Sequence, residues 1–365
     1  MNADAVQPER LVNTFLELVQ IDSPSGHEQA IGEHLKARLQ ELGCSVEQDE
    51  AGNLIARLPG RGDETVLLSA HMDTVGADVG IKPVIRDGVI YSEGDTILGS
   101  DDKSGVAVIL ETLACLKDHP EWPHPPLEIV ISVSEEQGLV GAKKLDKSRL
   151  QAKWGVVLDA GGPIGTLVYG APSQNSLKIT VLGKKAHAGS EPEKGINAIR
   201  VAAEAIAAMP LGRIDEETTS NIGIIKGGEA RNIVPDRVEM IGEARSRDDA
   251  KLQAQVDAMY AACHEAAARH GAKVEFEAEL AYRSYRIAPE QPPYAAAVRA
   301  LQTLGFEVRP KMSGGGTDGN IFNEAGIPCV VLSTGMADVH TPDEHIAIQD
   351  MVDSARVLLT LVTQT

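Results

Sequence analysis

The sequence has few cysteines and lacks both a long apolar run and the pattern of a secretory signal. Its 365 residues include only four cysteines, which are far apart and form neither a C-x-x-C pair nor a zinc-finger spacing. It contains no run of about 18 apolar residues that could span a bilayer, and residues 1–10 lack the basic-then-apolar pattern of a secretory signal. We therefore predict a soluble, cytoplasmic protein with reduced thiols.

Basic and aromatic residues are also scarce. Lys and Arg number 34 against 53 Asp and Glu, which gives a net charge of −19, and only 3% of residues are aromatic. Such an acidic surface argues against nucleic acid and anionic membranes as partners, and so few aromatic rings argue against a base-stacking platform. The excess of acid instead suits clustered carboxylates that a divalent cation would neutralise.

The apolar pattern indicates an α/β protein of about two domains. Hydrophobic residues make up 43% of the chain, and strand-like runs cover 65–69, 127–133 and 155–158, with a helix predicted over about 103–116. Alternating strands and helices predict a sheet covered by helices on both faces. Near the N-terminus, Ser25 and Glu28 form a capping-box pattern ahead of a predicted helix.

The pattern changes from about residue 174. Four strands and two helices follow in the order β-α-β-β-α-β, and the second helix ends in Arg269-His270-Gly271. The α/β character resumes after about residue 287. We predict a mixed, mostly parallel sheet domain over residues 1–173 and 288–365, interrupted by an α+β ferredoxin-like domain over residues 174–287.

Metal-ligand side chains follow the predicted strands, where open α/β sheets place their sites. His71 and Asp73 follow the first strand and, two residues apart, point to the same side, so Asp73 can fix the orientation of the His71 ring. Glu135 and Glu136 follow the second strand. On an extended backbone they project to opposite sides, so one can bind metal while the other acts as a general base.

Three further positions complete this set. Asp159 ends the third strand, Asp101 or Asp102 stands where the chain turns into a helix, and His340 follows the last strand. Each alone could be a turn residue, a helix N-cap or a surface histidine. Together, two imidazoles and several carboxylates predict a site for zinc, manganese or cobalt rather than for calcium, which takes only oxygen ligands.

Several segments of this sequence also carry a resemblance to a known family. Ser69-Ala70-His71-Met72-Asp73-Thr74-Val75, Gly99-Ser100-Asp101-Asp102-Lys103-Ser104-Gly105, Ser134-Glu135-Glu136 and the His340 segment stand in matching order and at matching separations. In these the chain resembles the co-catalytic dizinc exopeptidases, which include peptidase T, carboxypeptidase G, aminoacylase and succinyl-diaminopimelate desuccinylase. The Gly314–Gly319 segment and the Asp-Asp-Lys form make it most similar to the peptidase T branch.

The resemblance implies two divalent metal ions, with zinc as the first choice and manganese or cobalt as alternatives. It implies that His71 and Asp159 bind one ion, that Glu136 and His340 bind the other, and that Asp101 bridges them. The peptide bond between Asp101 and Asp102 would be cis. His345 is a rival ligand, but the family pattern of a histidine a few residues ahead of an acid, here Glu344, favours His340.

The resemblance also implies the roles of residues that bind no metal. Asp73 would orient His71, and Glu135 would take a proton from the bridging water and return it to the leaving amine. The inserted domain matches the family's lid, which usually forms the dimer interface, so a homodimer is expected. His187 would reach the partner's active site and stabilise the oxyanion.

Four substrate-binding residues follow in the same way. Asn232 and Arg245 would hold carboxylate or carbonyl groups of the substrate, and Gly316 and Thr317 would line the pocket. Arg245 could equally pair with a local acid such as Asp248, and His187 could be a surface residue of the lid.

The implied activity is hydrolysis of the N-terminal amide bond of short peptides, as in a tripeptide aminopeptidase. The same machinery could serve a carboxypeptidase or an N-acyl-amino-acid deacylase. A third hypothesis is a metal-binding scaffold without catalytic activity. Such a scaffold would not need a base such as Glu135 beside a complete set of metal ligands. The segment Pro192–Ala198 departs from authentic peptidase T, so the reaction class is better supported than the substrate.

Overall fold

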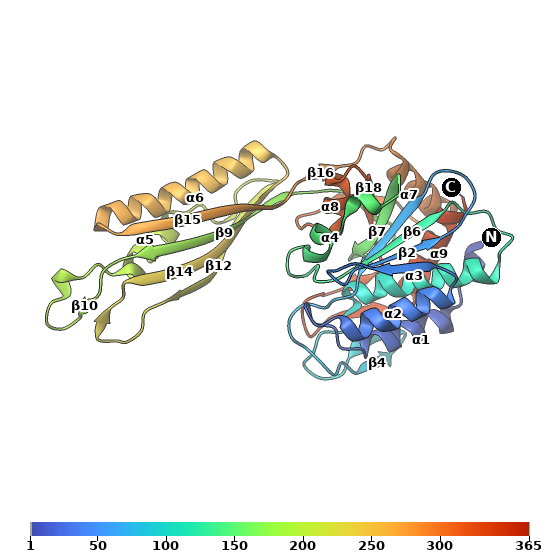
Figure 1. Ribbon diagram of the computed structural model, residues 1–365, viewed down its shortest axis with the longest axis horizontal. Coiled ribbons are helices and arrows are strands. Elements are labelled where there is room, and N and C mark those ends of the chain that lie inside the picture. Colours follow the sequence, from blue (N-terminus) through green and yellow to red (C-terminus); the bar gives the residue numbers. More distant parts are fainter. Residues whose placement is uncertain (1, 365) are drawn as a thin grey trace. The chain divides into compact units, whose positions relative to one another are not determined.

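The protein is described by a computed structural model that covers residues 2–364. The chain divides into two units (Figure 1). The first comprises the chain up to Gly170, Arg286–Ser313 and the chain from Thr317 onward, and the second comprises Ala171–Tyr285 with Gly314–Gly316. Over residues 2–364, the helices are too short or too polar to cross a membrane.

The first unit is built on a large mixed sheet, with a smaller sheet beside it. Its helices are η1 (Asn2–Ala5), α1 (Pro8–Val19), α2 (Gln29–Glu41), α3 (Ser100–Asp118), α4 (Val140–Lys144), η2 (Lys147–Arg149), α7 (Pro292–Thr303), α8 (Asp318–Glu324) and α9 (Ile348–Thr363). The large sheet contains β1 (Ser45–Gln48), β2 (Leu54–Leu58), β3 (Val66–His71), β6 (Leu127–Ser132), β7 (Trp154–Ala160), β8 (Thr166–Ala171), β16 (Tyr285–Arg286), β17 (Arg309–Met312) and β18 (Cys329–Ser333). The smaller sheet contains β4 (Pro83–Arg86), β5 (Val89–Ser92), β19 (Met336–Ala337) and β20 (His345–Ala347).

The large sheet runs in the order β1-β2-β6-β3-β7-β18-β8-β16, with β17 beside β8. Its centre is parallel, because β3 pairs in parallel with β6 and β7, and β18 pairs in parallel with β7. These strands are buried throughout or nearly so, as is typical of parallel strands covered on both sides. Helices lie on both faces of the sheet (Figure 1), and the predicted α/β fold class is confirmed.

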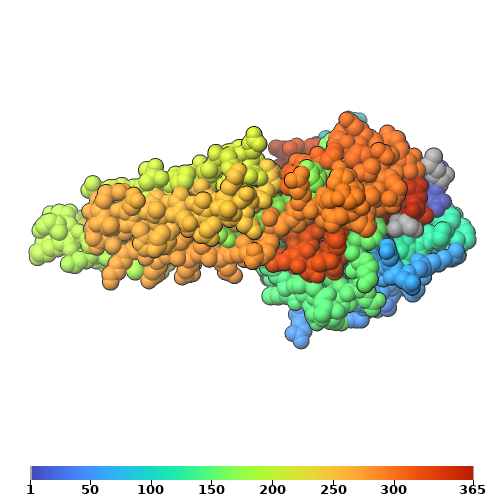
Figure 2. Space-filling model, turned by 90° about the horizontal axis from the view of Figure 1, so that it is seen from above, coloured from blue at the N-terminus to red at the C-terminus, as the bar shows by residue number. Residues whose placement is uncertain are grey.

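The second unit is an antiparallel sheet with two helices packed on one face. The sheet runs β11-β12-β14-β9-β15. Its elements, with a short two-stranded sheet beside it, are β9 (Ser173–Leu182), β10 (Ala186–His187), η3 (Pro192–Lys194), α5 (Ala198–Ala208), β11 (Gly212–Arg213), β12 (Thr218–Gly227), β13 (Ile233–Val234), β14 (Arg237–Ser246), α6 (Asp249–His270) and β15 (Lys273–Tyr282). The chain order β9-α5-β12-β14-α6-β15 is the predicted ferredoxin-like order, and α6 forms an outer face of this unit (Figure 2).

Local sequence signals explain the ends of α6. The Asp248 carboxylate accepts hydrogen bonds from the backbone N–H groups of Ala250 and Lys251, at 2.8 and 3.1 Å, and so caps the helix start. Gly271 follows the last turn with a left-handed φ of 67°, which glycine adopts without strain. The predicted glycine stop is therefore confirmed.

The capping box predicted at Ser25 and Glu28 is wrong. Helix α2 begins after Glu28, but neither side chain caps it. The Ser25 hydroxyl instead donates to the Asp73 carboxylate at 2.7 Å, and the Glu28 carboxylate accepts the Ser134 amide at 2.9 Å. Both side chains form hydrogen bonds with the segments that follow β3 and β6, and so neither bonds to the N–H groups at the start of α2.

Gly155 allows β7 to lie directly beside β3, and this packing gives a testable prediction. A Cβ at Gly155 would lie 2.5 Å from Leu67 Cβ and 2.7 Å from Leu67 O. We expect Gly155→Ala to lower the free energy of unfolding by about 1–3 kcal/mol through overpacking, measured by urea denaturation. Gly32→Ala is the control: its Cβ would meet only ordinary contacts at 3.7 Å, and we expect a gain of about 0.5–1 kcal/mol. Equal effects of the two changes would contradict this account.

Candidate metal centre

Parallel strands bring the predicted ligands to one edge of the large sheet. His71 is the last residue of β3 and pairs in register with Ser132, the last residue of β6. Asp159 lies near the end of the neighbouring strand β7. Because the carboxyl ends of parallel strands meet at the same edge, these side chains and those of the segment after β6 gather there.

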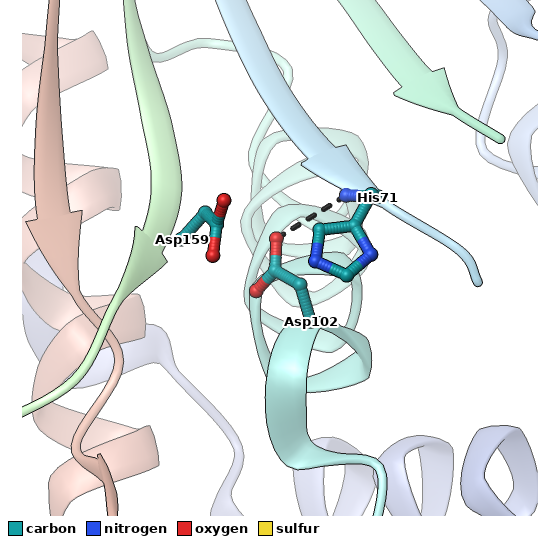
Figure 3. A group of neighbouring side chains, drawn as sticks. All are labelled: His71, Asp102 and Asp159. Atoms are coloured by element: carbon teal, nitrogen blue, oxygen red, sulfur yellow. Dashed lines mark hydrogen bonds between the residues drawn. The ribbon is translucent and has the colours of Figure 1, made fainter. Parts of the chain in front are cut away.

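His71, Asp102 and Asp159 form one group in which an atom of each lies within 4.8 Å of the others (Figure 3). Asp102 reaches this group from the start of α3. One of its carboxylate oxygens accepts the backbone N–H of His71 and the other accepts that of Gly105, each at 3.2 Å. The first turn of α3 is thereby fixed against the end of β3.

Asp101 stands between two imidazole rings. Its Oδ1 lies 3.2 Å from Nε2 of His71, and its Oδ2 lies 3.1 Å from Nε2 of His340. The same His340 nitrogen lies 2.8 Å from Oε1 of Glu136. The Asp101–Asp102 peptide bond is cis. A carboxylate with one imidazole at each oxygen has the placement of a ligand shared by two cations.

The His71 ring is oriented to offer Nε2 to a cation. Its Nδ1 lies 3.0 Å from the backbone oxygen of Asp73 and 3.3 Å from the Asp73 carboxylate. Nδ1–H therefore donates toward Asp73, which leaves the lone pair of Nε2 for a metal.

Burial and mutual repulsion raise the pKa values of several carboxyl groups in this site. Burial, followed by the charge of Asp159, raises the pKa of Glu135 and of Asp102 well above the usual values. Burial and the nearby Asp101 do the same for the pKa of Asp159. Carboxylates this crowded favour protons or cations, so divalent ions fit the site on electrostatic grounds.

The pKa values of the two histidines are also raised, but for an imidazole this shift favours the charged form. Hydrogen bonds to Asp101 and Glu136 raise the pKa of His340 to about 10. Burial lowers the pKa of His71, but Asp101 and Asp73 overcome it, and the net shift is upward. The donor set of two imidazoles and several carboxylates matches the ligand types of a dinuclear zinc-type centre.

Asp73 also ties the segment after β6 to the site. One of its carboxylate oxygens accepts the backbone N–H of Glu135 at 3.0 Å, and the other accepts that of Glu136 at 3.2 Å. The Ser25 hydroxyl bonds to the second oxygen. Asp73 therefore holds both glutamates as well as facing His71, which is more than the H-x-D spacing indicates.

The prediction that Glu135 and Glu136 point to opposite sides is not borne out. Ser134 has a φ of 50°, and the chain then turns, with the N–H of Leu139 donating to the Glu135 carbonyl at 2.7 Å. The backbone is thus not extended here, and an atom of each glutamate side chain lies within 4.8 Å of His71.

Comparison with known proteins finds relatives along nearly the whole chain. Residues 67–364 match the model of peptidase family M20/M25/M40. The uncharacterised protein YqjE of Bacillus subtilis is 42% identical over 98% of this chain and 99% of its own. A tripeptidase structure from Staphylococcus aureus is 40% identical, with a TM-score of 0.93 over 98% of each chain. An aminopeptidase PepT structure from Bacillus cereus is 42% identical, with a TM-score of 0.88 over 99% of each chain.

The chain belongs to peptidase family M20/M25/M40. The predicted kinship with peptidase T and the prediction of a metal-dependent peptidase are confirmed. In this M20 peptidase the described residues contain three candidate metal-ligand groups, which together include every predicted ligand: His71, Asp101, Glu136, Asp159 and His340.

His345 lies apart from these groups. Its ring stacks on Tyr91 with the centroids 5.4 Å apart, and its Nδ1 lies 2.9 Å from the backbone oxygen of Asp343. The structure thus places His340, and not His345, beside Asp101 and Glu136.

The predicted substrate-binding residues of the second unit group in two places. His187 and Asn232 are neighbours, because β10 pairs with β13 and the Asn232 carbonyl accepts the N–H of Ala188 at 3.0 Å. Arg245 lies near Gly314 and pairs with Glu243 through two N–O contacts of 2.9 Å. Asp248, its predicted alternative partner, caps α6 instead.

The glycine-rich segment is constrained by its contacts. A Cβ at Gly316 would lie 2.4 Å from the Tyr282 ring, so only glycine fits there. The Gly316 N–H donates to the Tyr282 hydroxyl at 3.1 Å. Thr317 caps α8 in a capping box with Asn320.

Sequence reasoning missed Asp318 as a residue of this centre. Its Oδ2 accepts the Ser132 hydroxyl at the end of β6, and its buried Oδ1 has no hydrogen-bond partner among residues 2–364. Burial raises the pKa of Asp318 to about 6. The Gly-Thr-Asp-Gly pattern drew attention to this segment, but an aspartate at a helix start has an ordinary structural explanation, and only the fold brings it to β6.

Proposed function

We propose that this peptidase is a zinc-dependent aminopeptidase that releases the N-terminal residue of short peptides, tripeptides foremost. The observation that carries the proposal is Asp101 set between Nε2 of His71 and Nε2 of His340. The similarity to a tripeptidase and to an aminopeptidase PepT, at 40% and 42% identity, supports the substrate class.

We assign the predicted ligands to two ions. His71 and Asp159 would hold one, Glu136 and His340 the other, and Asp101 both. When bound, the ions would lower the pKa of a water and polarise the scissile carbonyl. Imidazole and carboxylate donors favour zinc, with manganese or cobalt able to use the same groups.

We propose that Glu135 acts as the base. Its side chain is buried, and within the described chain no hydrogen-bond donor is bound to its carboxylate. Burial and the charge of Asp159 raise its pKa, which strengthens it as a proton acceptor. Glu135 would accept a proton from the attacking water and deliver it to the leaving amine.

His187 has the tautomer that an oxyanion donor needs. The backbone N–H groups of Gly189 and Ser190 donate to its Nδ1, at 3.2 and 3.1 Å. With Nδ1 accepting, the neutral ring carries its proton on Nε2 and can donate it. We propose that His187 stabilises the oxyanion, with Asn232 beside it, in a homodimer formed through the second unit.

Arg245 would bind substrate through the N–H groups of Nη1 and Nη2 that Glu243 and Gly314 do not occupy. Glu243 accepts hydrogen bonds from Nε and Nη2, while Nη1 lies 3.4 Å from the Gly314 carbonyl. We propose that these N–H groups contact a substrate carboxylate or carbonyl near the Gly316–Thr317 segment.

Replacing Glu135 tests the base directly. We expect Glu135→Ala to lower kcat by at least about 100-fold, since general-base catalysis contributes about 10²–10⁴-fold. Metal content, measured by plasma mass spectrometry, should stay near two ions per chain. Gln137→Ala, an exposed change in the same turn, is the control and should retain activity. An active Glu135→Ala protein would refute the assignment.

A mixed substrate panel tests the reaction itself. Free tripeptides, the same tripeptides N-acetylated, dipeptides and N-acyl amino acids are incubated with metal-free and zinc-restored protein, and products are identified by mass spectrometry. We expect zinc-dependent release of the first residue from free tripeptides, because the proposed substrate has a free amino terminus. Cleavage of the blocked compounds would instead establish a deacylase or carboxypeptidase.

A further inference from the structure

We infer that Glu344 is a positioning residue that holds the backbone of the bridging ligand Asp101 in place. The inference rests on the proposed function, because it requires Asp101 to bind metal. Glu344 does not belong to any candidate ligand group found in residues 2–364, and its carboxylate faces the backbone ahead of Asp101. Its side chain would act through Asp101 and not on the substrate.

The hydrogen bonds of the Glu344 side chain all come from four consecutive residues, Leu98 to Asp101. Its Oε2 accepts the backbone N–H groups of Leu98 and Gly99, each at 2.9 Å. Its Oε1 accepts the Ser100 hydroxyl at 2.6 Å and the backbone N–H of Asp101 at 3.1 Å. Glu344 is 1% exposed, so these donors have no water to replace it.

This arrangement needs a carboxylate. Gly99 has a left-handed φ of 75°, which helps direct the N–H groups of 98, 99 and 101 toward one acceptor. An ionised carboxylate has two acceptor oxygens and no hydrogen. A glutamine would keep one oxygen, but its NH₂ group would face donors, and at least one buried N–H would lose its partner.

The same loop also carries His340. Glu344 is four residues further on, and the loop is closed by bonds from the Thr341 hydroxyl to the Asp338 carbonyl at 2.6 Å and from the Glu344 N–H to the Thr341 carbonyl at 3.1 Å. It then enters β20, which pairs with β5 and β19. One braced loop thus supplies the ligand His340 and fixes Asp101 opposite it.

Loosening Asp101 should therefore weaken metal binding before it affects chemistry. Supporting groups of this kind change metal affinity by about 10–100-fold when replaced. We expect Glu344→Gln to bind zinc about 10–100-fold more weakly for at least one of two ions, measured by chelator competition on the full chain. At saturating zinc we expect kcat to recover to within a few-fold of wild type.

Glu128→Gln is the matched control. Glu128 is also a fully buried carboxylate, and it accepts the backbone N–H groups of Gln151 and Ala152 at 2.8 and 3.1 Å and Arg57 Nε at 3.0 Å. It lies on β6 four residues before Ser132, toward the other end of that strand. We expect Glu128→Gln to lower the melting temperature but to leave both zinc affinities unchanged.

The outcomes distinguish a failure of the Glu344 positioning role from a failure of the proposed metal centre. Wild-type zinc affinity in folded Glu344→Gln, or an equal loss in Glu128→Gln, would overturn the positioning role. Activity that saturating zinc does not restore would overturn it as well. A wild-type chain that binds fewer than two ions would refute the proposed metal centre and this inference with it. If Glu344→Gln does not fold, Ser100→Ala removes one of the four donors, and unaltered zinc binding there would refute the role.

Discussion

The buried negative charge at the carboxyl ends of β3, β6 and β7 is the constraint on which the rest of the structure depends. Asp159 repels both Asp102 and Glu135, and burial raises the pKa of all three carboxyl groups. Such a group is tolerable when cations occupy it, so the parallel sheet that gathers these side chains also commits the protein to metal chemistry.

A second set of carboxylates faces backbone N–H groups instead of a metal. Asp73 accepts the amides of Glu135 and Glu136, Glu28 accepts that of Ser134, and Glu344 accepts those ahead of Asp101. In each case the acid holds a segment that carries a proposed metal ligand or the proposed base. The acidic residues therefore fall into two groups, those proposed to bind metal and those that hold backbone segments in place. The net charge alone does not distinguish these groups.

Features that depend on residues close together along the chain could be predicted from the sequence. Features that depend on residues far apart along the chain could not. Hydrophobic periodicity predicts β3, β6, β7 and α6, because it reflects the local secondary structure. The ends of the predicted strands indicate His71, Asp159 and the Glu135-Glu136 pair as candidate site residues. The resemblance to the exopeptidase family selects Asp101 and His340 over their neighbours. Local patterns misassign Glu28 as a cap and leave Asp318 and Glu344 without a role, since their partners lie more than 100 residues away along the chain.

Anomalous X-ray scattering from crystals grown with zinc can determine whether Asp101 bridges two metal ions. We predict two peaks per chain above the zinc edge, one between His71 and Asp159 and the other between Glu136 and His340, with the Asp101 carboxylate between them. A single peak, or two peaks of which one lies away from Asp101, would contradict this bridging role.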